Sequence, residues 1–207
     1  MVPESDMAER KRPRGRPRCF DRDTALEAAM MLFWDRGYEA TSMDDLAEVM
    51  GLSPSSVYAC FGNKEKLYEA ALDRYLEGPG SYVARILAED IPVRTAFERL
   101  FEAAARELTR EGRPAGCMVA TAATHCSPAA SSVRAALAEM RADHVEQFEA
   151  RIRRGIAAGE LPAETDAAAL ARFLATVLQG LTVQARDGAS RAELQAIGRL
   201  AMRCWPA

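Results

Sequence analysis

Apolar residues recur every three to four positions along most of the chain, and no segment shows a convincing alternation of apolar and polar residues. The first pattern is typical of amphipathic helices and the second of strands, so the sequence predicts an all-α protein. Beyond residue 80, proline, glycine and capping residues divide the chain into five expected helices, at 81–89, 92–111, 128–158, 166–187 and 190–204. We therefore expect an N-terminal three-helix domain followed by a larger helical bundle.

The stretch from residue 41 to residue 72 carries the clearest helix signals. Ser42 and Asp45 have the spacing of a capping box, in which the serine accepts from the backbone N–H three residues on and the acid reaches back. Gly51 suits the left-handed conformation at the end of that helix. Ser53 and Pro54 then provide an N-cap and a proline in the first helical position. Two short helices joined by a tight turn are expected.

The spacing of small and apolar residues identifies these two helices as a helix-turn-helix. This motif needs a small residue where its helices cross, a glycine in the turn and an apolar residue inside the second helix; Ala47, Gly51 and Val57 supply them. The exposed start of the second helix is the part that enters the major groove of DNA. Its side chains there are short hydroxyls and a tyrosine: Ser53, Ser55, Ser56 and Tyr58. Asn63 caps the next helix, whose first residue, Lys64, is placed to bind a phosphate.

A longer pattern of punctuating positions surrounds the motif: Phe33-x3-Gly37-Tyr38-x2-Thr41-Ser42-x3-Leu46-Ala47-x3-Gly51-Leu52-Ser53-x3-Val57-Tyr58-x2-Phe61-x2-Lys64-Glu65-x-Leu67. This pattern resembles the N-terminal domain of the TetR/AcrR family of transcriptional regulators. The resemblance implies binding to double-stranded DNA, with contacts from Thr41, Ser42, Ser53, Ser55, Ser56, Tyr58 and Lys64. An ordinary three-helix bundle, in which these residues only pack, is the alternative. Cys60 departs from the family, which more often has a polar, basic or aromatic residue there.

Positive charge is concentrated in a short N-terminal segment. The net charge of the chain is only -3, and residues 1–76 carry 11 basic and 14 acidic side chains, so the DNA-binding domain is not basic as a whole. Residues 10–18 nevertheless hold six basic side chains and no acidic one. Arg14, Arg16 and Arg18 lie there among prolines and a glycine as in an AT-hook, which predicts contacts in an A·T-rich minor groove. A solubilising or non-specific phosphate-binding tail is the alternative.

Composition divides the chain into three parts. Residues 1–18 are polar, proline-containing and charged, which predicts a disordered basic arm. We expect the helix-turn-helix domain at 19–77, before the break at Gly78-Pro79-Gly80, and an effector-binding and dimerisation domain at 78–207. In the resembled family, the helix that begins after Asn63 physically joins the two domains.

The last two expected helices are apolar over wide faces, which one chain is not expected to bury. Pairing with the same helices of a second chain would make a four-helix interface, and the resembled family dimerises there. An exposed edge of a monomeric bundle is the alternative. The predicted interface consists of Leu170, Phe173, Leu174, Val177, Leu178, Leu181, Leu194, Ile197, Leu200 and Ala201.

Residues 116–126 are apolar and poor in charge, so we expect them at the centre of the bundle. The resemblance implies that this bundle encloses a pocket for a small organic effector. Its candidate lining residues are Phe97, Phe101, Met118, His125, Met140, His144, Phe148 and Phe173.

Cysteine and histidine residues near the middle of the chain suggest a second hypothesis. Cys117, His125 and Cys126, with His144 or Met118 to complete the set, could bind copper(I) or zinc. The cysteines could also respond as thiols, although a free cysteine is commonly a small buried apolar residue. Plain packing is favoured, so we expect no metal and no other cofactor. The chain has only two histidines and no nucleophile elbow, P-loop or metalloprotease motif, so we expect no enzymatic activity.

The remaining features favour a cytoplasmic protein without membrane contact. Five scattered cysteines without a CxxC pair fit a reducing compartment, and no uninterrupted apolar run reaches membrane length. The basic N-terminus is not followed by the apolar stretch of a signal peptide. We therefore predict a homodimeric regulator, more often a repressor in the resembled family, that binds a palindromic operator and is released by an effector. An architectural protein that binds A·T-rich DNA through its arm is the alternative.

Overall fold

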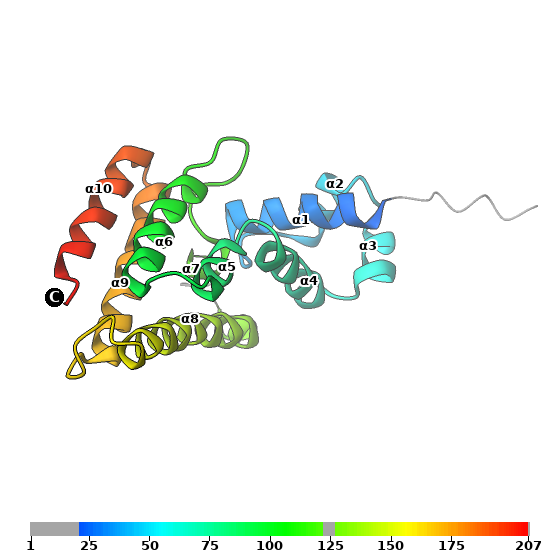
Figure 1. Ribbon diagram of the computed structural model, residues 1–207. Coiled ribbons are helices and arrows are strands. Elements are labelled where there is room, and N and C mark those ends of the chain that lie inside the picture. The colour runs from blue at the N-terminus through cyan, green and yellow to red at the C-terminus, as the bar shows by residue number, and fades with distance from the viewer. Residues whose placement is uncertain (1–20, 122–126, 207) are drawn as a thin grey trace, which may run out of the picture.

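The computed structural model describes residues 21–121 and 127–206, whose helices form two groups (Figure 1). The first group contains α1 (Arg22–Arg36), α2 (Met43–Val49), α3 (Pro54–Phe61) and α4 (Lys64–Glu77). The second contains α5 (Tyr82–Ala88), α6 (Val93–Leu108), α7 (Met118–Thr121), α8 (Ser131–Ala157), α9 (Ala167–Arg186) and α10 (Arg191–Ala201). The described residues contain no strand, which confirms the predicted all-α class. The predicted arm at residues 1–18 lies outside the described part of the chain.

The N-terminal helices begin and end where the capping signals predict. The hydroxyl of Ser42 accepts a hydrogen bond from the backbone N–H of Asp45 at 3.0 Å, and the Asp45 carboxylate accepts from the backbone N–H of Ser42 at 2.9 Å. Gly51 has a φ of 64°, in the left-handed region that favours glycine. Ser53 caps α3, with Pro54 in its first turn. The predicted helix-turn-helix is therefore confirmed.

The longer helices differ from the prediction at their ends. Helix α6 ends at Leu108 rather than at residue 111; at Thr109 the chain leaves the helical conformation, and the Thr109 hydroxyl donates to the Ala105 carbonyl oxygen at 2.7 Å. The segment expected from residue 128 opens with a 3₁₀ turn at Pro128–Ala130, and another at Met202–Cys204 follows α10. Tighter turns of this kind are common at helix ends. The spacing of apolar residues does not locate the exact residue at which a helix begins or ends.

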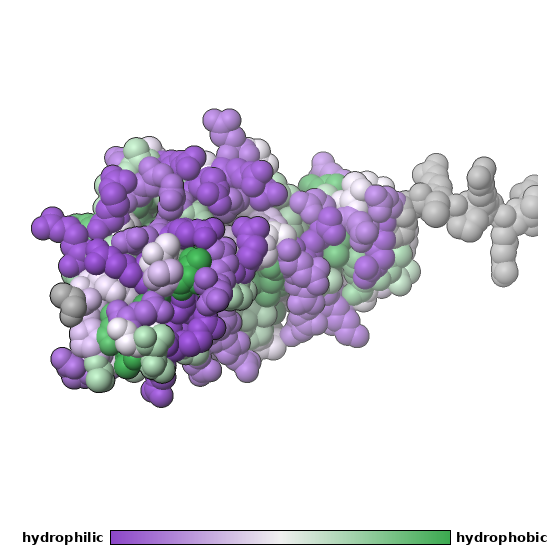
Figure 2. Space-filling view, viewed as in Figure 1, coloured by the Kyte–Doolittle hydropathy of each residue, from purple (hydrophilic) through white to green (hydrophobic). Residues whose placement is uncertain are grey.

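Two hydrophobic cores hold the helices together, and one of them crosses the predicted domain boundary. The first is formed by side chains of α5, α6, α8, α9 and α10. The second is formed by α1 to α4 together with Met118, Val119, Val133 and Leu137, which come from α7 and the first half of α8. Cys117 packs against both cores. The visible surface over the bundle is mainly hydrophilic, with apolar colour in small patches (Figure 2).

Hydrogen bonds at the C-terminal end of α1 also join the two groups of helices. The indole N–H of Trp34 donates to the Gly116 carbonyl oxygen at 3.1 Å. The guanidinium of Arg186, at the end of α9, donates to the carbonyl oxygens of Trp34 at 3.1 Å and Asp35 at 2.7 Å. Carbonyl groups in the last turn of a helix lack partners within that helix, so the arginine satisfies them. The last turn of α1 is thereby fixed to the bundle.

Candidate functional site

A small buried contact holds α2 and α3 in place as a unit. Ala47 and Val57 are buried in the core that these helices share with α1 and α4. The backbone N–H of Leu52 closes the turn by donating to the Ala47 carbonyl oxygen at 3.0 Å. Helix α3 lies at the end of the molecule opposite α10 (Figure 1). The helix-turn-helix therefore presents α3 away from the bundle.

One face of α3 is exposed and carries most of the predicted DNA contacts. Tyr58 is 53% exposed, an unusual value for a large aromatic side chain. The Oγ of Ser53 lies 2.9 Å from that of Ser55 and 2.8 Å from that of Ser56, so three hydroxyls gather at the N-terminal end of α3. The first turn contains no acidic residue. Its N–H groups and hydroxyls are suited to the acceptor oxygens of phosphates and bases.

Thr41 and Ser42 differ from these residues because their side chains already have structural partners. Thr41 is fully buried, and its hydroxyl donates to the Gly37 carbonyl oxygen at 2.7 Å. Ser42 is occupied by the capping box with Asp45, and its hydroxyl is the main cause of the lowered pKa of that carboxyl. The structure thus places both residues before α2, where they define the start of the helix.

Lys64 lies at the start of α4, beside the helix-turn-helix. Its ammonium lies 4.4 Å from the ring centre of Tyr38, within the range of a cation–π interaction. The same ammonium contributes to the lowered pKa of Asp45, which places it near the first turn of α2 as well. A lysine in this position is suited to a DNA phosphate. The three predicted arm residues, Arg14, Arg16 and Arg18, lie outside the described residues.

A second exposed surface, of apolar character, lies on α9 and α10. Six large hydrophobic side chains are exposed in the described chain, and four of them belong to these helices. They are Phe173 at 39%, Val183 at 51%, Ile197 at 38% and Leu200 at 61%, and we call them the α9–α10 face. Apolar side chains gathered on neighbouring helices are typical of an interaction surface.

The α9–α10 face includes only part of the predicted dimer interface. Three predicted residues belong to it, namely Phe173, Ile197 and Leu200. The others are buried within the chain (Leu174, Leu181, Leu194, Ala201) or half-buried (Leu170, Val177, Leu178). Val183 was missed because it stands between the polar residues Thr182 and Gln184, which obscures the apolar pattern. Both sides of α9 are apolar, so periodicity alone does not tell its inner side from its outer side.

Helix α9 is also long and apolar enough to cross a membrane, by length and composition alone. This differs from the sequence-based estimate, which found no apolar run of that length. The apolar residues of α9 are divided between the bundle core and the α9–α10 face. Packing in the bundle core accounts for the apolar residues on one side of α9, and those on the other side are exposed.

Among residues 21–121 and 127–206, the predicted effector residues border different cavities or lie in the packed cores. Phe97 and Phe148 are fully buried, and their ring centres lie 5.1 Å apart. Trp205 packs on Phe97 at 5.5 Å. Met118 is fully buried in the core that includes the DNA-binding helices. These side chains fill core space.

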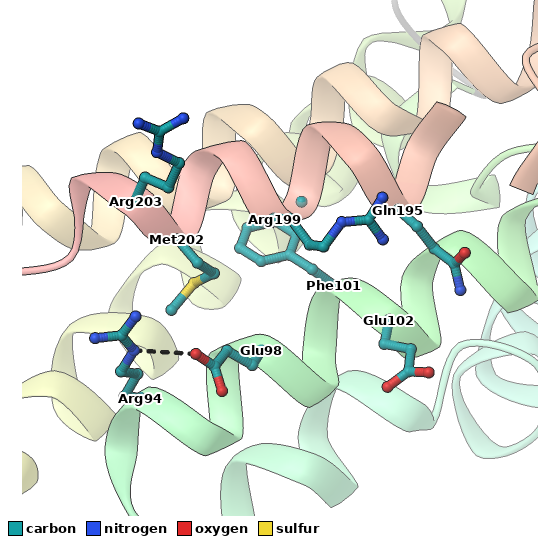
Figure 3. Close-up of a pocket in the computed structure, with 9 residues that line it drawn as sticks. Arg94, Glu98, Phe101, Glu102, Gln195, Arg199, Met202 and Arg203 are labelled. Carbon is teal, nitrogen blue, oxygen red and sulfur yellow. Dashed lines mark hydrogen bonds and ion pairs between the residues drawn. The ribbon is translucent and has the colours of Figure 1, made fainter. Parts of the chain in front are cut away.

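Phe101 lines a groove of about 460 Å³ between α6 and α10 (Figure 3). Gly198 allows the two helices to approach there, because a Cβ at this position would lie 2.8 Å from the Cβ of Phe101. Charged side chains surround the groove, and the guanidinium of Arg94 pairs with the Glu98 carboxylate at 3.0 Å. Most of the lining residues carry charged or polar groups, namely Arg94, Glu98, Glu102, Gln195, Arg199 and Arg203, and Phe101 and Met202 supply apolar surface.

Met140 and His144 line two smaller cavities on different sides of α8. Met140 borders one of about 150 Å³ between α4 and α8. His144 borders one of about 30 Å³ among α5, α8 and α9. Burial lowers the pKa of His144, so its imidazole is neutral at neutral pH. His125 lies outside the described residues, and Phe173 belongs to the α9–α10 face.

Within residues 21–121 and 127–206, no group of three His, Cys, Asp or Glu side chains is arranged to hold a metal ion. Cys117 is half-buried. His125 and Cys126 lie outside the described residues, so the metal hypothesis stays a prediction.

Comparison with known protein families accounts for both groups of helices. Residues 25–71 match the family of bacterial regulatory proteins described as the tetR family. Residues 95–199 match the tetracyclin repressor-like C-terminal domain. The first match contains the helix-turn-helix, and the second covers most of the bundle.

Individual relatives agree with these matches over nearly the whole chain. The HTH-type transcriptional repressor ComR of Escherichia coli is 39% identical over 197 residues, which cover 95% of this chain and 94% of ComR. The repressor BdcR of Escherichia coli is 30% identical over 187 residues, which cover 90% of each chain. The TetR family regulator CifR, solved as a cysteine mutant with a 26-base-pair operator duplex, is 44% identical with a TM-score of 0.89, covering 93% of this chain and 100% of that one. The chain therefore belongs to the TetR family of DNA-binding transcriptional regulators.

Proposed function

We propose that this protein is a cytoplasmic, homodimeric repressor that binds an inverted-repeat operator and is released by a small-molecule effector. The observation that carries the proposal is the exposed hydroxyl and tyrosine face of α3 on a rigid helix-turn-helix. ComR and BdcR are named as repressors, which supports repression rather than activation. The CifR structure contains operator DNA, which supports double-stranded DNA as the partner. The α9–α10 face supports the dimer.

In the proposed complex, two copies of α3 enter successive major grooves about 34 Å apart, so the operator repeats the same half-site in inverted orientation. Ser55, Ser56 and Tyr58 contact base edges, and Lys64 and the N–H groups at the start of α3 bind phosphates. The phosphate contacts fix the position of the protein on the duplex, and the base contacts select the sequence. The arginines of the arm add minor-groove contacts.

Release requires an effector that binds better to the arrangement of helices that does not fit DNA. The core shared by α4, α7 and α8 provides one physical connection between the bundle and the helix-turn-helix. The hydrogen bonds of Trp34 and Arg186 at the end of α1 provide another. A change in the packing of the bundle would therefore alter the separation of the two α3 helices.

The replacement Tyr58→Ala tests the assigned role of α3. Because Tyr58 is 53% exposed, its removal should leave the core intact. A lost base contact costs about 1–3 kcal/mol, and the symmetric dimer loses two, so affinity should fall at least about thirtyfold. Fluorescence anisotropy with a labelled operator duplex would measure the dissociation constant.

The matched control is Gln147→Ala, which changes an exposed side chain of α8 in the bundle. This variant should bind DNA as the parent does. Both variants should keep the helical circular dichroism and the dimer mass of the parent. Tight operator binding by Tyr58→Ala would contradict the proposed role of α3.

A further inference from the structure

Helix α3 has none of the side chains that usually recognise a base through two hydrogen bonds. Its eight residues include no charged residue, no asparagine and no glutamine. In the major groove, arginine or lysine most often recognises guanine, asparagine or glutamine recognises adenine, and an acidic residue recognises cytosine. A serine hydroxyl can pair with more than one base, so it selects less sharply. The helix expected to select the operator therefore needs another kind of contact.

The side of α3 that points away from the domain is centred on Ser55 and Ala59. Val57 is fully buried in the core of the DNA-binding helices. At 3.6 residues per turn, a residue two positions away lies on nearly the opposite side of a helix, and residues four apart lie on the same side. Ser55 and Ala59 each stand two positions from Val57, and both are exposed. In the proposed complex, the methyl group of Ala59 therefore lies at the middle of the surface that meets DNA.

The neighbours of Ala59 are suited to a close approach between α3 and the bases. Cys60 is also exposed and carries only a short thiol. Tyr58 is 53% exposed and lies about 100° round the helix from Ala59, so its ring is beside the central line. Short side chains at the centre let the helix approach the floor of the major groove. The contact made there is an apolar one.

The basic side chains nearest to α3 belong to neighbouring helices. The guanidinium of Arg22, in α1, lies 4.9 Å from the ring centre of Phe61 at the end of α3. The ammonium of Lys64, in α4, lies 4.4 Å from the ring centre of Tyr38. Cations at the edge of the motif are suited to phosphates, which fix the position of a protein on DNA but carry no sequence information. Base selection in the major groove is thus left to α3 itself.

We propose that α3 recognises a thymine in each half-site through the thymine C5-methyl group, which packs against the methyl group of Ala59. Thymine is the one base of the four that presents a methyl group in the major groove, and alanine is among the residues that contact it. Ser55, one turn before Ala59, is placed to pair with a polar group on a base edge nearby. The inference rests on the proposed function and adds Ala59 as a specificity-determining residue.

This contact can be removed from the DNA without changing a hydrogen bond. Deoxyuridine pairs with adenine as thymidine does, and it differs only in lacking the C5-methyl group. Burial of one methyl group changes a binding constant about fourfold. An inverted repeat contains the contact twice, so uracil in both half-sites should weaken binding about fifteenfold.

The experiment uses the full chain and a palindromic operator obtained by selection from a random library of duplexes. Each thymine of the half-site is replaced in turn by deoxyuridine, symmetrically in both half-sites, and fluorescence anisotropy measures the dissociation constant. At one thymine, uracil should weaken binding by the parent about fifteenfold. For Ala59→Gly the same replacement should change the dissociation constant less than about twofold, because the variant has no side chain to contact the methyl group.

The quantity compared is the ratio of the dissociation constants for the uracil and thymine duplexes. Glycine also lowers the stability of a helix, so Ala59→Gly should bind every duplex more weakly, and this general loss cancels in the ratio. Ala59→Ser, which presents a hydroxyl to the methyl group, should lower the ratio too and replaces the glycine variant if that one binds too weakly. The matched control is Ala138→Gly, at an exposed position of α8, and it should keep the ratio of the parent.

Two results would overturn the inference. The first is a parent for which no thymine of the half-site can be found whose replacement by uracil weakens binding more than about twofold. The second is the same ratio in the parent and in the Ala59 variants. If the parent selects no inverted repeat, the proposed function itself fails. If it selects one and gives either of these results, only the role of Ala59 fails.

Discussion

Replacing Leu200 by alanine should weaken the homodimer by about two orders of magnitude. Leu200 is 61% exposed in the single chain, the highest value on the α9–α10 face. The change removes three carbons, which contribute about 2.4 kcal/mol when fully buried. About three-fifths of that, roughly 1.5 kcal/mol, depends on burial by the partner, and twofold symmetry doubles it to about 3 kcal/mol. At about 1.4 kcal/mol per factor of ten, the dissociation constant should rise about 100-fold.

Sedimentation equilibrium over a dilution series would measure this dissociation constant. The control is Val49→Ala, which shortens an apolar side chain of α2 that is 45% exposed and lies in the other group of helices. Val49→Ala should leave the dimer as stable as the parent. An unchanged dissociation constant for Leu200→Ala, with the fold intact, would refute the assignment of the α9–α10 face.

The capping box and the N-terminal arm give further predictions. Ser42→Ala should lower the free energy of unfolding by about 1 kcal/mol, measured by chemical denaturation at neutral pH; an unchanged midpoint would exclude a stabilising cap. Because the Ser42 hydroxyl is the main cause of the lowered pKa of Asp45, this carboxyl contributes stability above its ordinary pKa of 3.8, which is lost as the pH falls through the folded value. The variant should therefore lose less stability on acidification below pH 4 than the parent does. Deleting residues 1–18 should reduce the slope of log binding constant against log salt concentration by about 0.9 for each lost phosphate contact. Equal slopes for the two proteins would show that the arm makes no phosphate contacts with the operator.

Features that depend on a few neighbouring residues were predictable from the sequence. The capping box of Ser42 and Asp45 and the left-handed Gly51 each involve groups within four positions of one another. Such signals act before the chain has folded, so they can be recognised without knowing what the helix packs against. For this reason the helix-turn-helix and the exposed face of α3 followed directly from the residues.

Contacts between distant residues were not predictable in this way. Trp34 and Gly116 are 82 positions apart, and Arg186 and Trp34 are 152 positions apart. Apolar periodicity shows that one side of a helix is covered, but not which element covers it. Phe97 and Phe148 illustrate this limit: the sequence shows that each lies on an apolar face, and the structure shows that their rings contact each other.

The cavity beside Cys117 is a second feature that depends on contacts between distant residues. The sequence marked Cys117 as a candidate metal or thiol residue, and His144 both as a possible further metal ligand and as a candidate residue of the effector pocket. Tyr82 carried no signal, because a tyrosine at helical spacing reads as an ordinary core residue. Only the folded arrangement of α5, α7, α8 and α9 brings the three side chains to one cavity.

The central claim of this account is that two copies of α3, held by one homodimer, recognise an inverted repeat. Selection of bound duplexes from a random library by the purified protein, at near-physiological salt, tests it most directly. The account predicts a palindromic motif whose half-sites are centred about one helical turn apart. Recovery of A·T-rich sequences without an inverted repeat would contradict it and would favour binding through the arm alone.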